Sequence, residues 1–272
     1  MSDVRSIWKG TLAFGLVNIP VRLYAAVEER SIRFRQLHRP CSTPVRYRKT
    51  CPTCGVEVPP EELARAYEVA PGRFVEVTDE DLEGLPLPTR HTVELLDFVE
   101  AGAVDPVAFL RGYYLEPDGG AKAYALLREA LRRSGRAGVA RLGLREKERL
   151  ALLRVAADGR TLALQTLLYP DEVRSPAELA IPGEVEVDPR EREMALRLVE
   201  MLSAPFDPGR YHDRSREALE ALIARKAQGE PLRAPAPERP TGVEELTRAL
   251  EESLRAAESR RDGRAAEPAG VR

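Results

Sequence analysis

Residues 7–26 read IWKGTLAFGLVNIPVRLYAA, and this stretch is the strongest indicator of the fold. It mixes alternation of apolar and polar residues with β-branched and aromatic side chains, which is typical of extended backbone. Gly10, Gly15 and Pro20 interrupt it. Glycine inside a strand often marks a tight bend at the corner of a barrel. We therefore expect two strands of a curved sheet here.

The following residues continue this mixed pattern. Helical spacing appears at 121–134, where Tyr124, Leu127 and Leu131 recur on one face and Gly135 supplies a C-terminal stop. Proline and acidic residues predict short helices at 59–65 and 78–82. Many strands with few helices indicate an α+β domain built on a β-barrel. The further predicted strands are 32–37, 73–77, 92–99, 113–117, 139–145, 149–155 and 161–169.

The composition changes in the last third of the chain. Residues 182–189 form a proline-bounded seam, and the segments 190–202 and 215–228 are predicted helices. From Gly229 onward Pro, Ala, Arg and Glu dominate, which is typical of a flexible segment. We expect a core over 1–185, a helical C-terminal region over 186–229 and a flexible tail over 230–272.

Charge is unevenly distributed along the 272 residues, although the formal net charge is only −2. Residues 22–49 contain eight Arg or Lys against two Glu, and residues 121–154 contain ten against three. Residues 57–100 contain twelve carboxylates against three Arg. Such segregation lets a nearly neutral protein present a basic surface to a polyanion.

The N-terminus and the cysteine content predict the compartment. Residues 1–10 lack the apolar run of a signal peptide, and no segment approaches the length and hydropathy of a membrane span. Three cysteines without an export signal favour a reducing compartment over a disulfide framework. We therefore expect a cytoplasmic protein that does not contact membranes.

All three cysteines lie in one short region. His-x2-Cys and Cys-x2-Cys, separated by nine residues, offer one imidazole and three thiolates, the ligand count of a closed structural zinc site. Two alternatives remain: small buried apolar residues beside a surface histidine, or a Cys-x2-Cys redox pair. The predicted zinc ligands are His38, Cys41, Cys51 and Cys54.

Arginine-rich strands flank this cysteine region. Side chains of one sign on one face of paired strands can contact phosphates without reading bases. The same charges could instead keep edge strands from pairing with other sheets. The candidate DNA-binding residues are Arg22, Arg33, Arg35, Arg46, Arg48, Lys49, Arg141 and Arg145.

The sequence offers little for catalysis. Only His38, His91 and His212 occur, and there is neither a glycine-rich phosphate loop nor a Gly-x-Ser-x-Gly elbow. A binding protein is therefore favoured over an enzyme. The alternatives are a zinc-dependent or Cys-x2-Cys redox enzyme and a sequence-specific regulator with a zinc hairpin.

Several blocks, in order over about residues 5–230, resemble the prokaryotic Ku proteins of non-homologous end joining. No matching motif occurs after Gly229. The blocks are IWKG at 7–10, FGLVNIPV at 14–21, TDEDL at 78–82, YYLEP at 113–117, AYALL at 123–127 and LLYPDEVR at 167–174.

The resemblance implies a homodimeric ring that threads onto the ends of double-stranded DNA without sequence specificity, near the nucleoid. It implies a β-barrel with an inserted DNA-encircling arm, about residues 31–70, that carries a zinc-ribbon-like hairpin. It also implies that the helical C-terminal arm recruits the multidomain ATP-dependent DNA ligase that seals the break.

Overall fold

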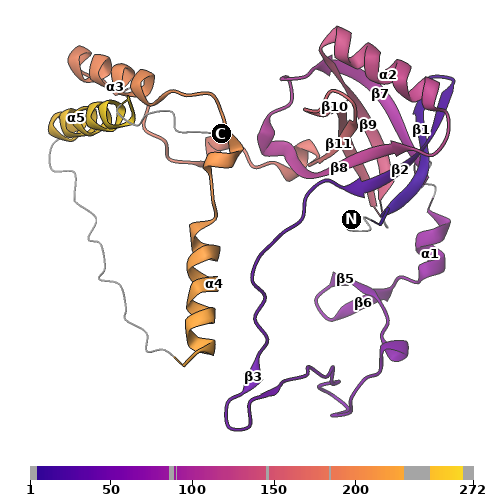
Figure 1. The fold of residues 1–272 in the computed structure, drawn as a ribbon. Coiled ribbons are helices and arrows are strands. Elements are labelled where there is room, and N and C mark those ends of the chain that lie inside the picture. Colours follow the sequence, from indigo (N-terminus) through magenta and orange to yellow (C-terminus); the bar gives the residue numbers. More distant parts are fainter. Residues whose placement is uncertain are drawn as a thin grey trace. The chain divides into compact units, whose positions relative to one another are not determined.

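The structure is a computed structural model of the chain (Figure 1). It divides into two compact units, Met1–Glu178 and Leu179–Arg272, which are described separately. The residues that it describes are 5–85, 89, 91–144, 147–183, 185–229 and 246–265.

The first unit contains a closed seven-stranded barrel in the order β1-β2-β8-β11-β10-β9-β7. Neighbouring strands are antiparallel except β1 and β7, whose parallel pairing closes the barrel. The predicted α+β barrel is thereby confirmed. The strands are β1 (Trp8–Phe14), β2 (Val17–Ala25), β7 (Thr92–Glu100), β8 (Phe109–Pro117), β9 (Arg136–Leu144), β10 (Lys147–Val155) and β11 (Leu162–Leu167).

The closure of the barrel depends on Gly10. The amide of Thr11 donates to the carbonyl of His91 at 2.9 Å. A Cβ atom on Gly10 would lie 2.3 Å from the carbonyl oxygen of His91 and 2.3 Å from the ring of Trp8. Only glycine lets the two backbones approach this closely, which gives a physical reason for the glycine in the opening stretch.

The barrel core extends into the helix α2 (Ala121–Ser134), which buries Tyr124, Leu127 and Leu131 as its spacing predicts. The hydroxyl of Tyr124 donates to the carbonyl of Leu115 at 2.8 Å and accepts from the amide of Leu162 at 2.7 Å. This hydroxyl therefore anchors the helix to strands β8 and β11. Other fully buried core residues are Leu12, Ile19, Leu23, Leu142, Leu153 and Leu164.

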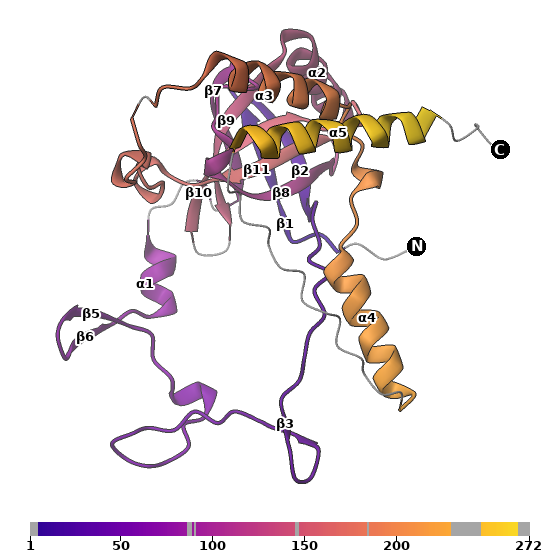
Figure 2. The ribbon, with the colours of Figure 1, turned by 90° about the vertical axis from the view of Figure 1, so that its left-hand side faces the viewer.

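Between β2 and β7 the chain leaves the barrel, and residues 27–85 are here called the arm. None of these residues, all of which are described, is buried. Figures 1 and 2 both show the arm extending from the side of the barrel opposite α2. Its elements are β3 (Leu37–His38), β4 (Thr43–Pro44), the 3-10 turn η1 (Pro60–Glu62), β5 (Ala66–Ala70), β6 (Arg73–Glu76) and α1 (Asp79–Gly84).

Two local predictions in the arm need correction. The strand expected at 32–37 is reduced to the two-residue β3, and the helix expected at 59–65 is only the 3-10 turn η1. Neither segment has a buried face, so alternation alone does not organise it into a sheet. The helix α1 does form, with Thr78 as its N-cap and a capping box to Asp81.

The second unit is helical. The helices α3 (Pro189–Leu202) and α4 (Arg214–Ala227) agree with the predicted segments, and neither contains a buried residue. A third helix, α5 (Leu246–Ala265), lies within the expected flexible tail. It contacts α3 through an ion pair between Arg197 and Glu258 at 3.2 Å. No helix in the described part of the chain is long and apolar enough to span a membrane.

Candidate nucleic-acid interface

Four of the predicted DNA-binding cations are exposed and unpaired. Arg33, Arg35, Arg46 and Lys49 lie in the arm, and none forms a side-chain hydrogen bond or ion pair with any residue that the structure describes. An exposed cation without a carboxylate partner can approach a phosphate without first breaking an ion pair. These four residues therefore make the arm a candidate phosphate-binding surface.

The arm presents two arginines, the unpaired Arg46 and its neighbour Arg48, beside an aromatic ring. The amide of Val45 donates to the carbonyl of Gln36 at 3.0 Å, which prolongs the β3–β4 hairpin. The hydroxyl of Tyr47 donates to the side-chain carbonyl of Gln36. Arg46 and Arg48 flank this anchored tyrosine, so they emerge from a segment whose course is locally held.

Three other predicted cations are already paired. The guanidinium of Arg22 lies 2.6 Å from Asp118, Arg48 lies 2.7 Å from Glu57, and Arg141 lies 3.4 Å from Glu94. A phosphate must compete with a carboxylate at each of them, which makes them weaker candidates. Arg145 lies outside the described residues.

Asp118 is the centre of the strongest of these pairings. It also accepts from the ammonium group of Lys9 at 2.7 Å. Hydrogen bonds from Lys9 and then Arg22 lower the pKa of Asp118, and the carboxylate raises the pKa of Arg22 in turn. These ion pairs tie β1, β2 and the end of β8 together.

The predicted zinc ligands form two separate pairs. His38 Nδ1 lies 3.0 Å from Cys41 Sγ within the β3–β4 hairpin. Cys51 and Cys54 share another turn, in which the amide of Gly55 donates to the carbonyl of Cys51 at 2.8 Å and Gly55 takes a φ of 69°. Among the described residues, no three metal-ligating side chains come together.

The structure therefore does not support the zinc site, because a closed site needs four ligands around one ion. Each ligand pair lies in a turn closed by its own backbone hydrogen bonds, and the bridge between Thr50 and Glu57 belongs to the second turn. Local hydrogen bonds also lower the pKa of two thiols. The hydroxyl and amide of Thr43 act on Cys41, and the amides of Cys54 and Thr53 act on Cys51.

Comparison with known protein families identifies the family of this chain. Residues 13–196 match the family described as the Ku70/Ku80 beta-barrel domain. The chain belongs to the Ku family. The match spans every strand of the barrel except the first residues of β1, together with the whole arm and the first residues of α3.

Bacterial relatives named "Non-homologous end joining protein Ku" support the assignment. The relative from Symbiobacterium thermophilum is 49% identical over 263 residues, which cover 96% of this chain and 65% of that protein. The relative from Heliobacterium modesticaldum is 46% identical, covering 92% and 91% of the two chains. The relative from Bacillus subtilis is 39% identical, covering 98% and 87%. The resemblance to bacterial Ku proteins is therefore confirmed.

This Ku family member also has a cationic cluster that the sequence did not single out. Residues 121–154 form a basic block, of which the sequence pattern indicates only Arg141 and Arg145, on one face of a predicted strand, as DNA-binding candidates. The structure groups Arg128, Arg132 and Arg133 of α2 with Arg160, a residue 27 to 32 positions later. Helical spacing predicts that the three arginines of α2 lie close together, whereas Arg160 joins them only through the tertiary fold.

Proposed function

We propose that this protein binds the ends of double-stranded DNA without sequence specificity, as a ring-shaped homodimer, in double-strand break repair by non-homologous end joining. The observation that carries the proposal is the arm. This long insertion in a Ku-family barrel contains no buried residue. Four of its cations form no ion pair with a described carboxylate, namely Arg33, Arg35, Arg46 and Lys49. The role is binding and not catalysis.

Phosphate contacts from the arm explain why sequence specificity is not expected. Arginine and lysine side chains that reach the DNA backbone position the protein on the duplex but do not read base edges. Each neutralised phosphate releases counterions, so affinity falls steeply as salt rises. We therefore expect binding that depends on salt and on a free end, with no dependence on base sequence.

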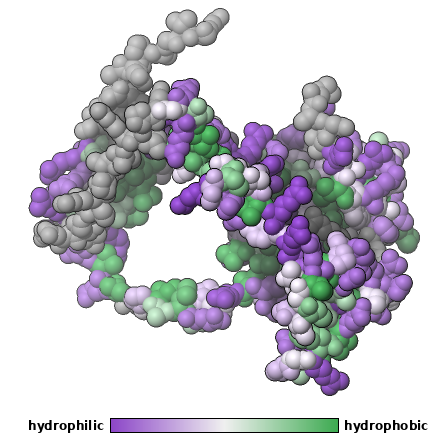
Figure 3. Space-filling view, turned by 90° about the horizontal axis from the view of Figure 1, so that it is seen from below, coloured by the Kyte–Doolittle hydropathy of each residue, from purple (hydrophilic) through white to green (hydrophobic). Residues whose placement is uncertain are grey.

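Exposed apolar side chains support a homodimer. In the arm, Phe34 is 73% exposed and Phe74 is 63% exposed. Figure 3 shows hydrophobic residues scattered over the surface among hydrophilic ones. Large aromatic side chains such as Phe34 and Phe74 are enriched where one protein surface covers another. A second copy that covers them would complete a ring around DNA.

The second unit is the proposed recruitment surface for the multidomain ATP-dependent DNA ligase. Its helices α3 and α4 have no buried residues, so their apolar positions remain available to a partner. In this proposal residues 1–185 form the ring, and the DNA-encircling insertion, about residues 31–70, lies within the arm. Residues 186–229 recruit the ligase, 230–272 form a tail, and the protein acts on the bacterial nucleoid in the cytoplasm. No zinc-dependent step enters it, since the two ligand pairs do not converge.

A competition experiment tests threading. The protein is bound to a labelled linear duplex and challenged with unlabelled DNA of the same length and sequence. This competitor is supplied as an open linear duplex, as a linear duplex blocked at both ends by hairpins larger than a ring could pass, or as a closed circle. We expect the open linear form to compete at least tenfold better than the other two.

The outcomes separate the candidate functions. Equal competition by circle and open linear duplex overturns the ring proposal. Competition that depends on base sequence rather than on free ends favours a sequence-specific regulator. Turnover of a thiol or disulfide substrate, measured separately, would favour the redox enzyme.

A further inference from the structure

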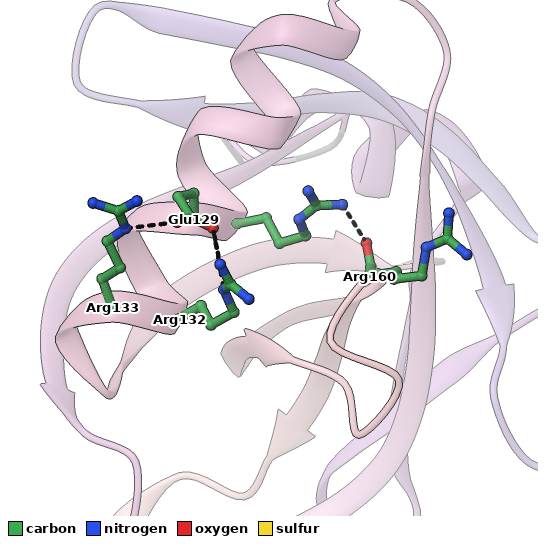
Figure 4. A network of polar contacts seen from close by, with 5 residues as sticks. Glu129, Arg132, Arg133 and Arg160 are labelled. Atoms are coloured by element: carbon green, nitrogen blue, oxygen red, sulfur yellow. Dashed lines mark hydrogen bonds and ion pairs between the residues drawn. The ribbon is translucent and has the colours of Figure 1, made fainter.

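The exposed side of α2 carries a cationic surface that the proposed ring does not use. Burial of Tyr124 and Leu127 directs one side of the helix into the barrel. The turn between β10 and β11 brings Arg160 beside the exposed side (Figure 4). The α2 patch is defined here as Arg128, Arg132, Arg133 and Arg160 together with Glu129.

Hydrogen bonds within the α2 patch hold three of its four guanidinium groups, those of Arg128, Arg132 and Arg133. Glu129 accepts from Arg132 Nη2 at 2.7 Å and from Arg133 Nε at 2.6 Å. Arg128 Nη1 donates to the carbonyl of Arg160 at 3.1 Å. Each of these arginines keeps further N–H donors that are not used inside the patch. An array that is already positioned loses less side-chain entropy when it binds an anion.

Positive charge remains in excess within the patch. Arg133 and then Arg132 lower the pKa of Glu129, so this carboxylate stays ionised and offsets one of the four cations. Asp158, in the same turn as Arg160, offsets one more. Its carboxylate accepts from the hydroxyl of Thr161 at 2.6 Å and from the amide of Arg160 at 3.0 Å. A net positive surface remains after both acids are included.

The α2 patch lies away from the proposed DNA path. Both ribbon views place α2 on the side of the barrel opposite the arm (Figures 1 and 2). A duplex held between the barrel and the arm would leave the patch exposed to a second polyanion. This step rests on the proposed function, because it takes the arm side of the barrel as the first DNA site.

We propose that the α2 patch binds the phosphate backbone of a second DNA duplex while the first is held on the arm side. Planar guanidinium forks match phosphate oxygens well. The patch offers a protein partner one exposed apolar anchor, Leu126, which is 69% exposed. Protein interfaces usually have a larger apolar centre, so nucleic acid fits this surface better.

A bridging experiment tests this role. A linear duplex is immobilised by one end, the protein is loaded through the free end, and a fluorescent closed circle is added as the second duplex. We expect Arg132→Glu/Arg133→Glu to load normally but to capture at least tenfold less circle at about 0.1 M salt. Arg111→Glu/Arg174→Glu is the matched control, because it makes the same charge change at exposed arginines outside the patch.

A second variant guards against a folding artefact. Arg160→Glu changes the β10–β11 turn without touching the helix, and it should also reduce circle capture while leaving loading intact. If the wild type captures no circle, or if the patch variants capture as much as the control, the α2 proposal is overturned. Failure to load on the linear duplex is scored separately, because it contradicts the ring proposal instead.

Discussion

The hydroxyl of Tyr124 is a polar group of a buried side chain, and it forms two hydrogen bonds. It is surrounded by apolar core, and burial raises its pKa. Its two hydrogen bonds satisfy backbone groups of β8 and β11 that water reaches poorly. Helical spacing predicts that this residue faces the core, but the two partners come from strands on either side of α2 in the sequence.

Tyr124→Phe removes only this oxygen and leaves the carbonyl of Leu115 and the amide of Leu162 without their partner. The expected loss in the free energy of unfolding is about 1–3 kcal/mol, the usual cost of an unsatisfied buried polar group. Urea unfolding of the variant measures this loss. Tyr114→Phe is the control, because that ring is 45% exposed, and an equal loss there would contradict the explanation.

Asp158 predicts a pH dependence. Hydrogen bonds, first from the hydroxyl of Thr161, lower its pKa to about 2. The folded value lies below the unfolded value of about 3.9. The ionised carboxylate therefore stabilises the turn fully above about pH 4, and this contribution is lost as the pH falls toward 2.

We expect Asp158→Asn to lower the Tm at neutral pH, and the difference from the wild type should shrink between about pH 4 and pH 2. Thermal melting at several pH values measures it. Asp171→Asn serves as the control, because this exposed carboxylate accepts no hydrogen bond from a described residue. A difference that stays constant down to pH 2 would show that the carboxylate charge is not responsible.

At the scale of elements, the parallel contact between β1 and β7 turns a sheet into a barrel. Gly10→Ala places a methyl group against the carbonyl of His91, so the strands must separate or distort. We expect a loss of about 1–3 kcal/mol in the free energy of unfolding, as for other overpacked sites. Gly102→Ala, which meets open space, should be close to neutral. Equal unfolding midpoints for the two variants would contradict this role of Gly10.

The arm gives a second prediction at this scale. Arg46 is unpaired whereas Arg48 is held by Glu57, so the two arginines, two positions apart, form a matched pair. Arg46→Ala should reduce the slope of log affinity against log salt by about one, since one phosphate contact is lost. Arg48→Ala should change the slope less. Titrations of linear DNA at several salt concentrations measure the slope for each variant. Equal changes of slope in the two variants would contradict the distinction between Arg46 and Arg48.

At the scale of the whole molecule, exposed apolar residues predict self-association. Light scattering without DNA should give twice the mass of the chain. Phe34→Glu/Phe74→Glu introduces charge on the arm, outside the helices assigned to the ligase, and should shift the mass toward the monomer. Leu16→Glu, at a fully exposed turn, should leave the mass unchanged. A wild-type protein that stays monomeric at micromolar concentration would contradict the homodimer.

The sequence by itself determined the parts of the fold that depend on local periodicity. Alternation predicted the barrel strands, and helical spacing predicted α2 with its three buried residues, because each pattern must place one face in the core. In the arm, where no face is buried, the strand expected at 73–77 forms as β6, whereas the strand expected at 32–37 and the helix expected at 59–65 do not form as expected. The sequence predicted the arm cations as DNA-binding candidates together with paired ones. It could not show which of them lack a carboxylate partner.

Only the tertiary structure decided which cations are neutralised. Arg22 meets Asp118 and Arg141 meets Glu94 because barrel register brings together residues 96 and 47 positions apart. Ion pairs of this kind leave no trace in local spacing. The cysteines show the converse, since regular spacing suggested one site while the ligands form two pairs in separate turns that do not come together. Charge and spacing are local properties, whereas partnership between side chains depends on how the chain folds back on itself.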